Sequence, residues 1–255
     1  MRTNREIYDT AAFGDWTTYT NLETHEAFLA KKYFDPLKRT VEAGAGGGRI
    51  VLGLQGLGFR DLHAFDYVSQ FVEEVRRRDA KREIHLSAQD ATRLAYRDES
   101  FDQALYLAQL VCLIEGAEKK EVRDCVLSEA FRVLRAGGTS IFSFLSHEVR
   151  SRSRVYRLYL TYLRGLRELT RARRDLQTLP WLKIGDRFNK GALLDRGPYL
   201  HWYRAQEAVD DLCAAGFTIR AVASLSQLKA ERMCLSMEEL LREPLSGHFY
   251  CVCTK

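Results

Sequence analysis

The feature that most constrains the fold of this chain is a glycine-rich run at residues 42–49, which holds four glycines. Residues 39–43 before it have the pattern of a β-strand, and residues 47–57 after it have the pattern of a helix. Glycine allows a sharp turn between them and lets the backbone approach a ligand closely. A dinucleotide-binding loop requires glycine at the sixth position counted from Gly44, where Arg49 stands. The pattern is instead acidic-x-Gly-x-Gly-x-Gly.

Downstream of this loop, β-rich and helical segments alternate as far as residue 145, which is typical of repeated βαβ units on a parallel sheet. The predicted strands are residues 61–65, 84–87, 101–107, 139–144, 217–224 and 248–254. The predicted helices are residues 69–78, 119–134 and 206–215, the second of them ending at Gly137 and Gly138. With residues 39–43 this makes seven strands, so we expect an α/β fold whose mostly parallel sheet has helices on both faces.

Length and composition fit one folded domain over residues 1–255, because 46% of the residues are hydrophobic and only 4 are proline. We expect an aromatic-rich helical lid at residues 1–36 and a ligand-binding core at residues 37–146. A partly helical insertion on the substrate side follows at residues 147–204. Residues 205–255 return to the core with a helix and the last strands.

The glycine run resembles motif I of the class I methyltransferases that depend on S-adenosylmethionine (SAM). The resemblance spans residues 40–145 and the last helix and two strands. Residues 101–109 resemble the family's fourth strand, and residues 127–138 resemble its helix leading into the fifth strand, with Ala136 in place of the usual proline. The resemblance implies a three-layer Rossmann-like methyltransferase fold, with SAM as cofactor and S-adenosylhomocysteine as product.

The family's cofactor-binding positions can be carried over residue by residue. Glu42 would orient the loop or the methionine amino group of SAM, and the backbone of Gly44, Ala45 and Gly46 would lie beside the cofactor. Asp66, at the end of the second predicted strand, would accept hydrogen bonds from both ribose hydroxyls. Asp66 could instead be a helix N-cap or a solvated loop acid, and the same alternative holds for Asp90, which follows the third predicted strand.

The remaining cofactor candidates surround the adenine and the sulfonium. Asp90, followed by Ala91, would lie near the adenine amino group, and Tyr67 is a candidate to pack on the adenine face. Gln109 and Leu110, at the end of the fourth strand, are candidates to border the methyl-donor sulfur.

Candidates for the acceptor side come from the segments that often build the acceptor pocket in this family. They are Trp16 and Tyr19 in the N-terminal segment and Tyr199 and Tyr203 before the last helix. His147 and His201 are the candidate general bases, although each is more often structural. Methyl transfer also proceeds by alignment and desolvation alone, because the sulfonium is already a strong electrophile.

Positive charge is concentrated in the insertion. Residues 148–174 hold nine arginines and two glutamates, a net charge of +7, whereas the rest of the chain sums to −2. Helical spacing predicts seven of these arginines on one exposed helical face, opposite an apolar stripe of Val155, Tyr159, Tyr162, Leu163, Leu166 and Leu169. The seven are Arg150, Arg154, Arg157, Arg164, Arg167, Arg171 and Arg174. Such a face is either merely solvated or contacts the phosphates of RNA, an anionic membrane surface or a negatively charged small substrate.

Several site classes are not expected. The six cysteines lack zinc-site spacing, and Cys251 and Cys253 are expected to point to opposite or unrelated sides of their strand, so we expect reduced core thiols and no metal site. No segment has the length and apolarity of a membrane span, and no signal-peptide core follows Met1. The chain is therefore expected to be cytoplasmic.

The expected activity is transfer of the SAM methyl group to a small-molecule acceptor. One alternative is an RNA methyltransferase that uses the arginine face, and another is a non-catalytic SAM-binding partner subunit. A nicotinamide-dependent enzyme is the alternative at the level of the fold.

Overall fold

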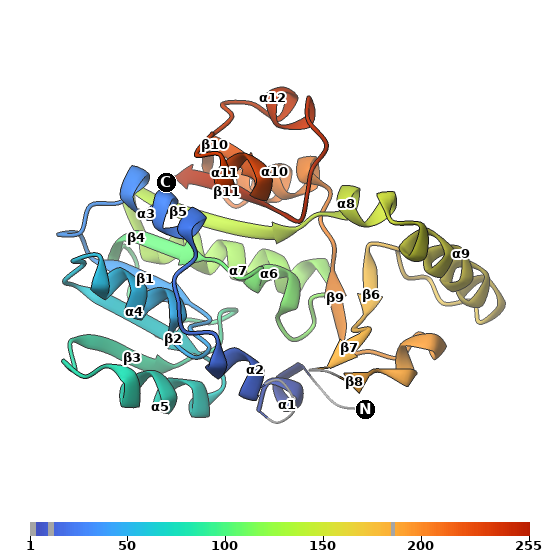
Figure 1. Cartoon of the computed structure of the whole chain (residues 1–255), viewed down its shortest axis with the longest axis horizontal. Coiled ribbons are helices and arrows are strands. Elements are labelled where there is room, and N and C mark those ends of the chain that lie inside the picture. Colours follow the sequence, from blue (N-terminus) through green and yellow to red (C-terminus); the bar gives the residue numbers. More distant parts are fainter. Residues whose placement is uncertain (1–3, 10–12, 185–186) are drawn as a thin grey trace.

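The computed structural model describes residues 4–9, 13–184 and 187–255, and its centre is a sheet of seven strands in the order β10-β11-β5-β4-β1-β2-β3 (Figure 1). The pairs β1–β2, β2–β3, β1–β4 and β4–β5 are parallel, and β11 is antiparallel to both β5 and β10. The strands are β1 (Thr40–Ala43), β2 (Leu62–Asp66), β3 (Ile84–Ala88), β4 (Phe101–Tyr106), β5 (Leu134–Leu145), β10 (Thr218–Ser224) and β11 (His248–Thr254). The predicted α/β fold with a mostly parallel sheet is confirmed.

Helices cover both faces of this sheet and bury two separate apolar cores. One face carries α3 (Thr24–Tyr33), α4 (Arg49–Gly56), α5 (Ser69–Arg78) and α11 (Leu225–Lys229). The other carries α6 (Leu110–Leu113), α7 (Lys120–Val133), α10 (Ala205–Ala214) and α12 (Met237–Leu241). Along β4, Ala104 and Tyr106 pack in one core and Leu105 in the other, because successive side chains of a strand point to opposite faces.

The same alternation corrects one prediction about the thiols. Cys251 and Cys253 both lie in the core on the α7 face, because residues two apart on a strand share a face. All six cysteines are free, and four of them are buried.

The end of α7 also differs from the sequence prediction. The helix ends at Val133 and β5 begins at Leu134, so the glycine pair does not cap the helix. Instead the Gly137 amide donates to the Lys255 carbonyl at 2.9 Å, and the Lys255 amide donates to the Gly138 carbonyl at 3.1 Å. The two glycines therefore join β5 to the last residue of the chain.

The insertion between β5 and α10 lies beyond the carboxyl edge of the sheet, on the right in Figure 1. It has two antiparallel strand pairs, β6 with β9 and β7 with β8. Its elements are α8 (His147–Arg152), α9 (Arg154–Leu169), β6 (Thr178–Pro180), β7 (Lys183–Ile184), β8 (Arg187–Phe188), the 3-10 helix η1 (Lys190–Leu194) and β9 (Tyr199–His201). After β9 the chain returns to the sheet, where the Tyr203 amide donates to the Leu145 carbonyl at 2.9 Å.

Two short helices precede α3. They are α1 (Asn4–Asp9) and α2 (Phe13–Thr18), and α1 is held beside α6 because the Asn4 side-chain amide donates to the carbonyls of Leu113 and Ile114 at 2.8 and 3.0 Å. Across the part of the chain that the structure describes, no helix is both long and apolar enough to cross a membrane.

Candidate functional site

A cavity of about 410 Å³ opens at the carboxyl ends of β1, β2, β3 and β4. Its size falls within the range of small-molecule sites, and its position is where open α/β sheets bind ligands. It is lined by Arg5, Tyr8, Trp16, Gly44, Gly46, Phe65, Asp66, Tyr67, Phe71, Gln89, Asp90, Ala91, Thr92, Leu107, Ala108, Leu110, Leu113, Ile114 and Glu115.

The glycine loop between β1 and α4 forms one wall of this cavity. Gly44 and Gly46 have φ values of +69° and +51°, a region that other residues rarely adopt. A Cβ atom on Gly44 would also lie 2.7 Å from Cδ1 of Leu110, across the cavity wall. Ala45 lies between the two glycines, but its side chain is buried in the core rather than lining the cavity.

Glu42 joins the end of β1 to the helix that follows the glycine loop. Its side chain is 2% exposed, and Oε2 accepts a hydrogen bond from the Val51 amide in the first turn of α4 at 2.8 Å. Burial raises the pKa of Glu42, and the nearby Arg49 guanidinium opposes that rise. Of the two roles that the resemblance allows, the geometry matches orientation of the loop, because Glu42 is absent from the cavity lining among the described residues.

Asp66 ends β2 and is bonded to the glycine loop. One carboxylate oxygen accepts from the Gly46 amide and the other from the Val68 amide, both at 2.9 Å. Burial raises the pKa of Asp66 to about 6, while the backbone amides that donate to it act in the opposite direction. A carboxylate has about four acceptor positions, so Asp66 retains capacity for ligand hydroxyls.

Tyr67, directly after β2, and Asp90, two residues after β3, also line the cavity. The Tyr67 hydroxyl is buried and has no hydrogen-bond partner among the described residues. Asp90 is exposed, and one of its carboxylate oxygens accepts from both the amide and the hydroxyl of Thr92 at 2.8 Å. Ala91 is buried beside it. The Asp90 turn therefore leaves a second carboxylate oxygen for a ligand.

The N-terminal helices supply three lining residues. Arg5 and Tyr8 come from α1 and Trp16 from α2; the two aromatic residues belong to the aromatic-rich segment expected as a lid, whereas Arg5 was not predicted. Arg5 lies over the Tyr67 ring, with 5.9 Å from its guanidinium carbon to the ring centroid. Aromatic enrichment of the first 36 residues was the only available signal, and it could not distinguish Tyr8 from Tyr19, which is 62% exposed after α2.

The charges on the lining favour a cationic ligand over a dinucleotide. Three carboxylates, those of Asp66, Asp90 and Glu115, line the cavity against one guanidinium. A pyrophosphate would bind at the N-terminus of α4. The Trp16 carbonyl oxygen packs against Gly47 at this point, so closely that a Cβ added to Gly47 would lie 2.5 Å from it. An oxygen acceptor packed there disfavours an anion, which counts against a nicotinamide dinucleotide.

Gln109 does not border the cavity as expected, although its neighbours Leu107, Ala108 and Leu110 do. Ala108 and Gln109 both have positive φ, 51° and 59°. This turn directs the Gln109 side chain to His248, with 3.0 Å between Nε2 and Nδ1. Gln109 thus joins α6 to β11 instead of contacting the cavity.

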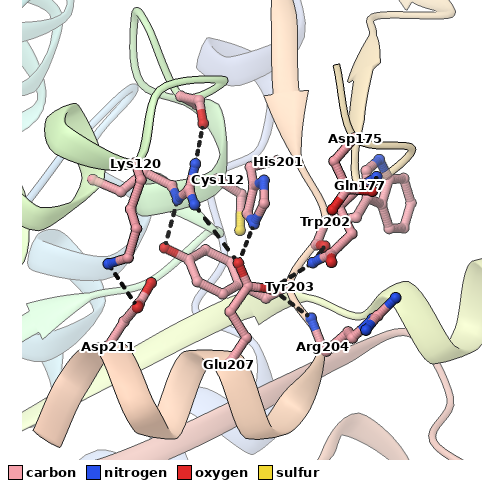
Figure 2. A network of polar contacts seen from close by, with 12 residues as sticks. Cys112, Lys120, Asp175, Gln177, His201, Trp202, Tyr203, Arg204, Glu207 and Asp211 are labelled. Atoms are coloured by element: carbon pink, nitrogen blue, oxygen red, sulfur yellow. Dashed lines mark hydrogen bonds and ion pairs between the residues drawn. The ribbon is translucent and has the colours of Figure 1, made fainter. Parts of the chain in front are cut away.

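The candidates His201 and Tyr203 both belong to a buried polar network around Glu207 of α10 (Figure 2). His201 Nε2 lies 2.7 Å from Glu207 Oε1, and the Tyr203 hydroxyl accepts from Nε of Arg123 at 3.0 Å. Gln177 also donates to Glu207. Neither candidate lines the cavity, and their partners explain them as structural residues that bind the insertion to α7 and α10.

The other two acceptor-side candidates in the insertion lie outside the cavity lining as well. His147 is the first residue of α8, and its amide donates to the Tyr203 carbonyl at 2.8 Å. Burial lowers the pKa of His147, with Arg150 contributing, so its imidazole is neutral at pH 7. The Tyr199 hydroxyl donates to the Asp195 carbonyl, and the Arg174 guanidinium carbon lies 4.1 Å from the Tyr199 ring centroid.

The prediction of one helical face with seven wet arginines is wrong. The helix is broken at Ser153 and ends at Leu169, so Arg150 lies on α8 and Arg171 and Arg174 follow α9. Arg150 and Arg167 are buried, whereas the other five are exposed. The apolar stripe is partly exposed too: Val155, Tyr162 and Leu169 are 75%, 48% and 85% exposed, while Leu163 is buried.

Among the residues that the structure describes, one cluster could ligate a metal, which the sequence spacing did not indicate. Ligand atoms of Asp61, just before β2, and of His63 on β2 and His85 on the neighbouring β3 lie within 4.8 Å of one another. Arg39 donates to Nε2 of His63 at 3.1 Å, and burial lowers the pKa of His63 to about 4. The cluster is thus already occupied by a guanidinium, which opposes a second cation.

Residues 41–142 match the model of the methyltransferase domain family, and no curated protein matches the chain. Among solved structures, a SAM-dependent methyltransferase from Methanosarcina mazei is 16% identical with a TM-score of 0.66, over 92% of this chain and 98% of that one. The CcbJ methyltransferase from Streptomyces caelestis is 12% identical with a TM-score of 0.65, over 99% and 98%. A SAM-dependent methyltransferase from Thermotoga maritima, described as a possible histamine N-methyltransferase, is 20% identical with a TM-score of 0.57, over 99% of both chains.

Proposed function

Because residues 41–142 match the methyltransferase domain family, we propose that the protein transfers the methyl group of SAM to a small-molecule acceptor. The observation that carries the proposal is the cavity at the carboxyl ends of β1 to β4, which α1 and α2 border from the outside with Arg5, Tyr8 and Trp16. A cavity bordered in this way suits a small acceptor better than a polymer.

The described residues fit SAM in shape and charge. Gly44 and Gly46 provide a cradle that a Cβ would fill, and Asp66 is proposed to accept the ribose hydroxyls. Asp90 and Tyr67 are proposed to hold the adenine, the first through its free carboxylate oxygen and the second through its ring or its unpartnered hydroxyl. When bound, SAM supplies an electrophilic sulfonium methyl group.

The chain's own contribution is proposed to be alignment and exclusion of water. Leu110, Leu113 and Ile114 give the cavity an apolar wall, and Tyr8 and Trp16 cover it. No histidine is present among the described residues that line the cavity, so no imidazole is positioned as a base. An amine acceptor fits this arrangement, because it can lose its proton to water before it attacks. The description of the Thermotoga structure names histamine, which is an amine, and this agrees with an amine acceptor.

The test is transfer of a labelled methyl group from SAM into a cell extract separated into small molecules, RNA and protein. The wild-type protein is compared with Asp66→Ala and with the matched surface variant Asp210→Ala, whose exposed side chain accepts a hydrogen bond from Gln206 of the same helix. We expect label in the small-molecule fraction with the wild type and Asp210→Ala, and strongly reduced label with Asp66→Ala.

Two other outcomes would contradict the proposal. Label that ribonuclease removes would favour an RNA acceptor, for which the exposed arginines Arg164, Arg171 and Arg174 around a hollow of the insertion are the candidate contacts. Measured SAM binding without transfer to any fraction would favour a SAM-binding partner subunit.

A further inference from the structure

The insertion contains a buried cation whose hydrogen-bond donors are unused. Arg150 of α8 is 1% exposed, and its Nε, Nη1 and Nη2 atoms have no hydrogen-bond partner among the described residues. Trp202 packs against it, with 5.5 Å from the guanidinium carbon to the ring centroid. The Trp202 indole Nε1 is also buried and without a partner. Two adjacent side chains thus present buried donors and no acceptor.

A second buried arginine in the same insertion, Arg167, has a hydrogen-bond acceptor for each of its donors. Arg167 is 4% exposed, and Asp195 accepts from it with both carboxylate oxygens at 2.8 Å. Its remaining donors bond to the carbonyls of Arg174, Asp175 and Thr178 at 2.6 to 3.1 Å. Arg167 therefore has the complete set of acceptors that Arg150 lacks.

The unmatched donors of Arg150 require a physical explanation. Burying a charge without a partner is strongly unfavourable, and buried polar groups in native proteins are almost always satisfied by protein, water or an ion. Burial lowers the pKa of Arg150 only to about 10, so the guanidinium is fully charged at neutral pH. The face of the Trp202 ring attracts this charge, but it accepts none of the in-plane N–H groups in the way that an oxyanion does.

We propose that Arg150 and Trp202 bind a carboxylate or phosphate group carried by the methyl acceptor, an inference that rests on the proposed function. A planar guanidinium pairs with an oxyanion through two parallel N–H donors, and the indole N–H supplies a third. The acceptor class is therefore an anionic small molecule, and for an amine acceptor this means an amino acid or an amino phosphate.

The position of Arg150 agrees with a role toward the acceptor. α8 begins two residues after β5 ends, so Arg150 lies beyond the same carboxyl edge of the sheet as the cavity, although neither Arg150 nor Trp202 is among the residues that line it. In Figure 2, His201 and Tyr203 point to the Glu207 side of their segment and Trp202 points to the other side. The Trp202 backbone bonds to Gln177 of this network, but its indole N–H takes no part in it.

The test uses the three tryptophans of the chain, Trp16, Trp181 and Trp202, whose indole N–H groups give separate NMR signals. The full-length protein labelled with ¹⁵N is titrated with inorganic phosphate, with acetate, and separately with S-adenosylhomocysteine. We expect phosphate or acetate to shift the Trp202 signal in a saturable way and to raise Tm, and S-adenosylhomocysteine to shift the Trp16 signal. Arg150→Gln is expected to lose the Trp202 shift, whereas the exposed control Arg154→Gln retains it.

The readouts separate this inference from the proposed function. A Trp16 response without any Trp202 response to either anion would overturn the oxyanion site and leave SAM binding intact. A missing Trp16 response would instead count against the cofactor site. If Arg150→Gln does not fold, Trp202→Phe serves as a second variant, because it keeps an aromatic ring and removes the indole N–H. It is expected to weaken the anion-induced rise in Tm.

The source of the oxyanion is tested with the labelled small-molecule product. An acceptor-borne group predicts an anionic product on ion exchange and inhibition of methyl transfer by phosphate. A neutral product whose formation phosphate leaves unchanged would show that the site takes a free anion, and it would overturn the assignment to the acceptor.

Discussion

The Asp66 carboxylate accepts a hydrogen bond from the Gly46 amide at 2.9 Å, which ties the end of β2 to the glycine loop after β1. The same carboxylate accepts from the Val68 amide, so both of its oxygens are already oriented before a ligand arrives. Loop and carboxylate therefore form one preorganised unit, and a change in either one should affect both cofactor affinity and local stability.

Replacing Asp66 should weaken cofactor binding more than it destabilises the fold. Asp66→Ala removes the proposed acceptor of the ribose hydroxyls, and hydrogen bonds to a charged group contribute about 1.5–3 kcal/mol each. We expect at least a tenfold increase in the Kd for S-adenosylhomocysteine, measured by calorimetry. Asp210→Ala, a surface change on α10, should leave this Kd unchanged, and equal weakening by both variants would contradict the assignment.

The raised pKa of Asp66 gives cofactor affinity a defined pH dependence. Its value of about 6 in the folded protein lies above its usual value of 3.8, so this group favours folding most below pH 3.8, and that contribution is lost as the pH rises through 6. The ribose hydroxyls of SAM would donate to the ionised carboxylate. The affinity for SAM should therefore fall as the pH is lowered and Asp66 becomes protonated. Between pH 7 and pH 5 we expect about a tenfold loss of affinity. Asp66→Asn should bind weakly with no pH dependence in this window.

The conformation of Gly44 is the next point at which the site can be tested. Gly44→Ala places a methyl group 2.7 Å from Leu110 and forces alanine to a φ of +69°, which costs about 1–2 kcal/mol in backbone strain alone. We expect a lower Tm and a loss of cofactor binding. Gly56→Ala is the matched control, because a Cβ there meets nothing within 4 Å and alanine favours a helix. Its Tm should be equal or higher, and its binding unchanged.

The sequence was informative where a local pattern determines the backbone. The glycine loop, the acidic strand ends at Asp66 and Asp90, and the alternation of strands and helices depend on neighbouring residues, so they could be predicted. Leu110 was predicted for the same reason and lines the cavity, whereas the side chain of Gln109 does not. Its direction depends on two successive positive φ values and on a contact with His248, 139 residues away.

The insertion could not be predicted in the same way, because helical periodicity says which residues share a face but not what covers that face. The seven arginines have helical spacing, yet Ser153 interrupts the helix and Asp195 draws Arg167 into the interior. Arg5 and Tyr8 reach the cavity through long-range contacts of α1, among them the hydrogen bonds from Asn4 to carbonyls more than one hundred residues away. Such contacts are set by tertiary structure and leave no local signal.

A structural role of His201 differs from a catalytic role in its effect on stability and on turnover. His201 Nε2 lies 2.7 Å from Glu207 Oε1. Burial acts to raise the pKa of Glu207, but its hydrogen bonds, including the one with His201, lower this pKa overall. The depressed pKa means that Glu207 contributes stability above its usual pKa of 4.5, and that this stability is lost as the pH falls through the folded value. His201→Ala leaves the Glu207 carboxylate with fewer donors, which should lower the free energy of unfolding by about 1–3 kcal/mol. Urea denaturation at pH 7 measures this loss, and methyl transfer per folded molecule should remain within about twofold of wild type since His201 lies outside the cavity lining. A hundredfold drop in kcat with unchanged stability would instead restore His201 as a base, because a general base contributes about that factor and a purely structural residue does not.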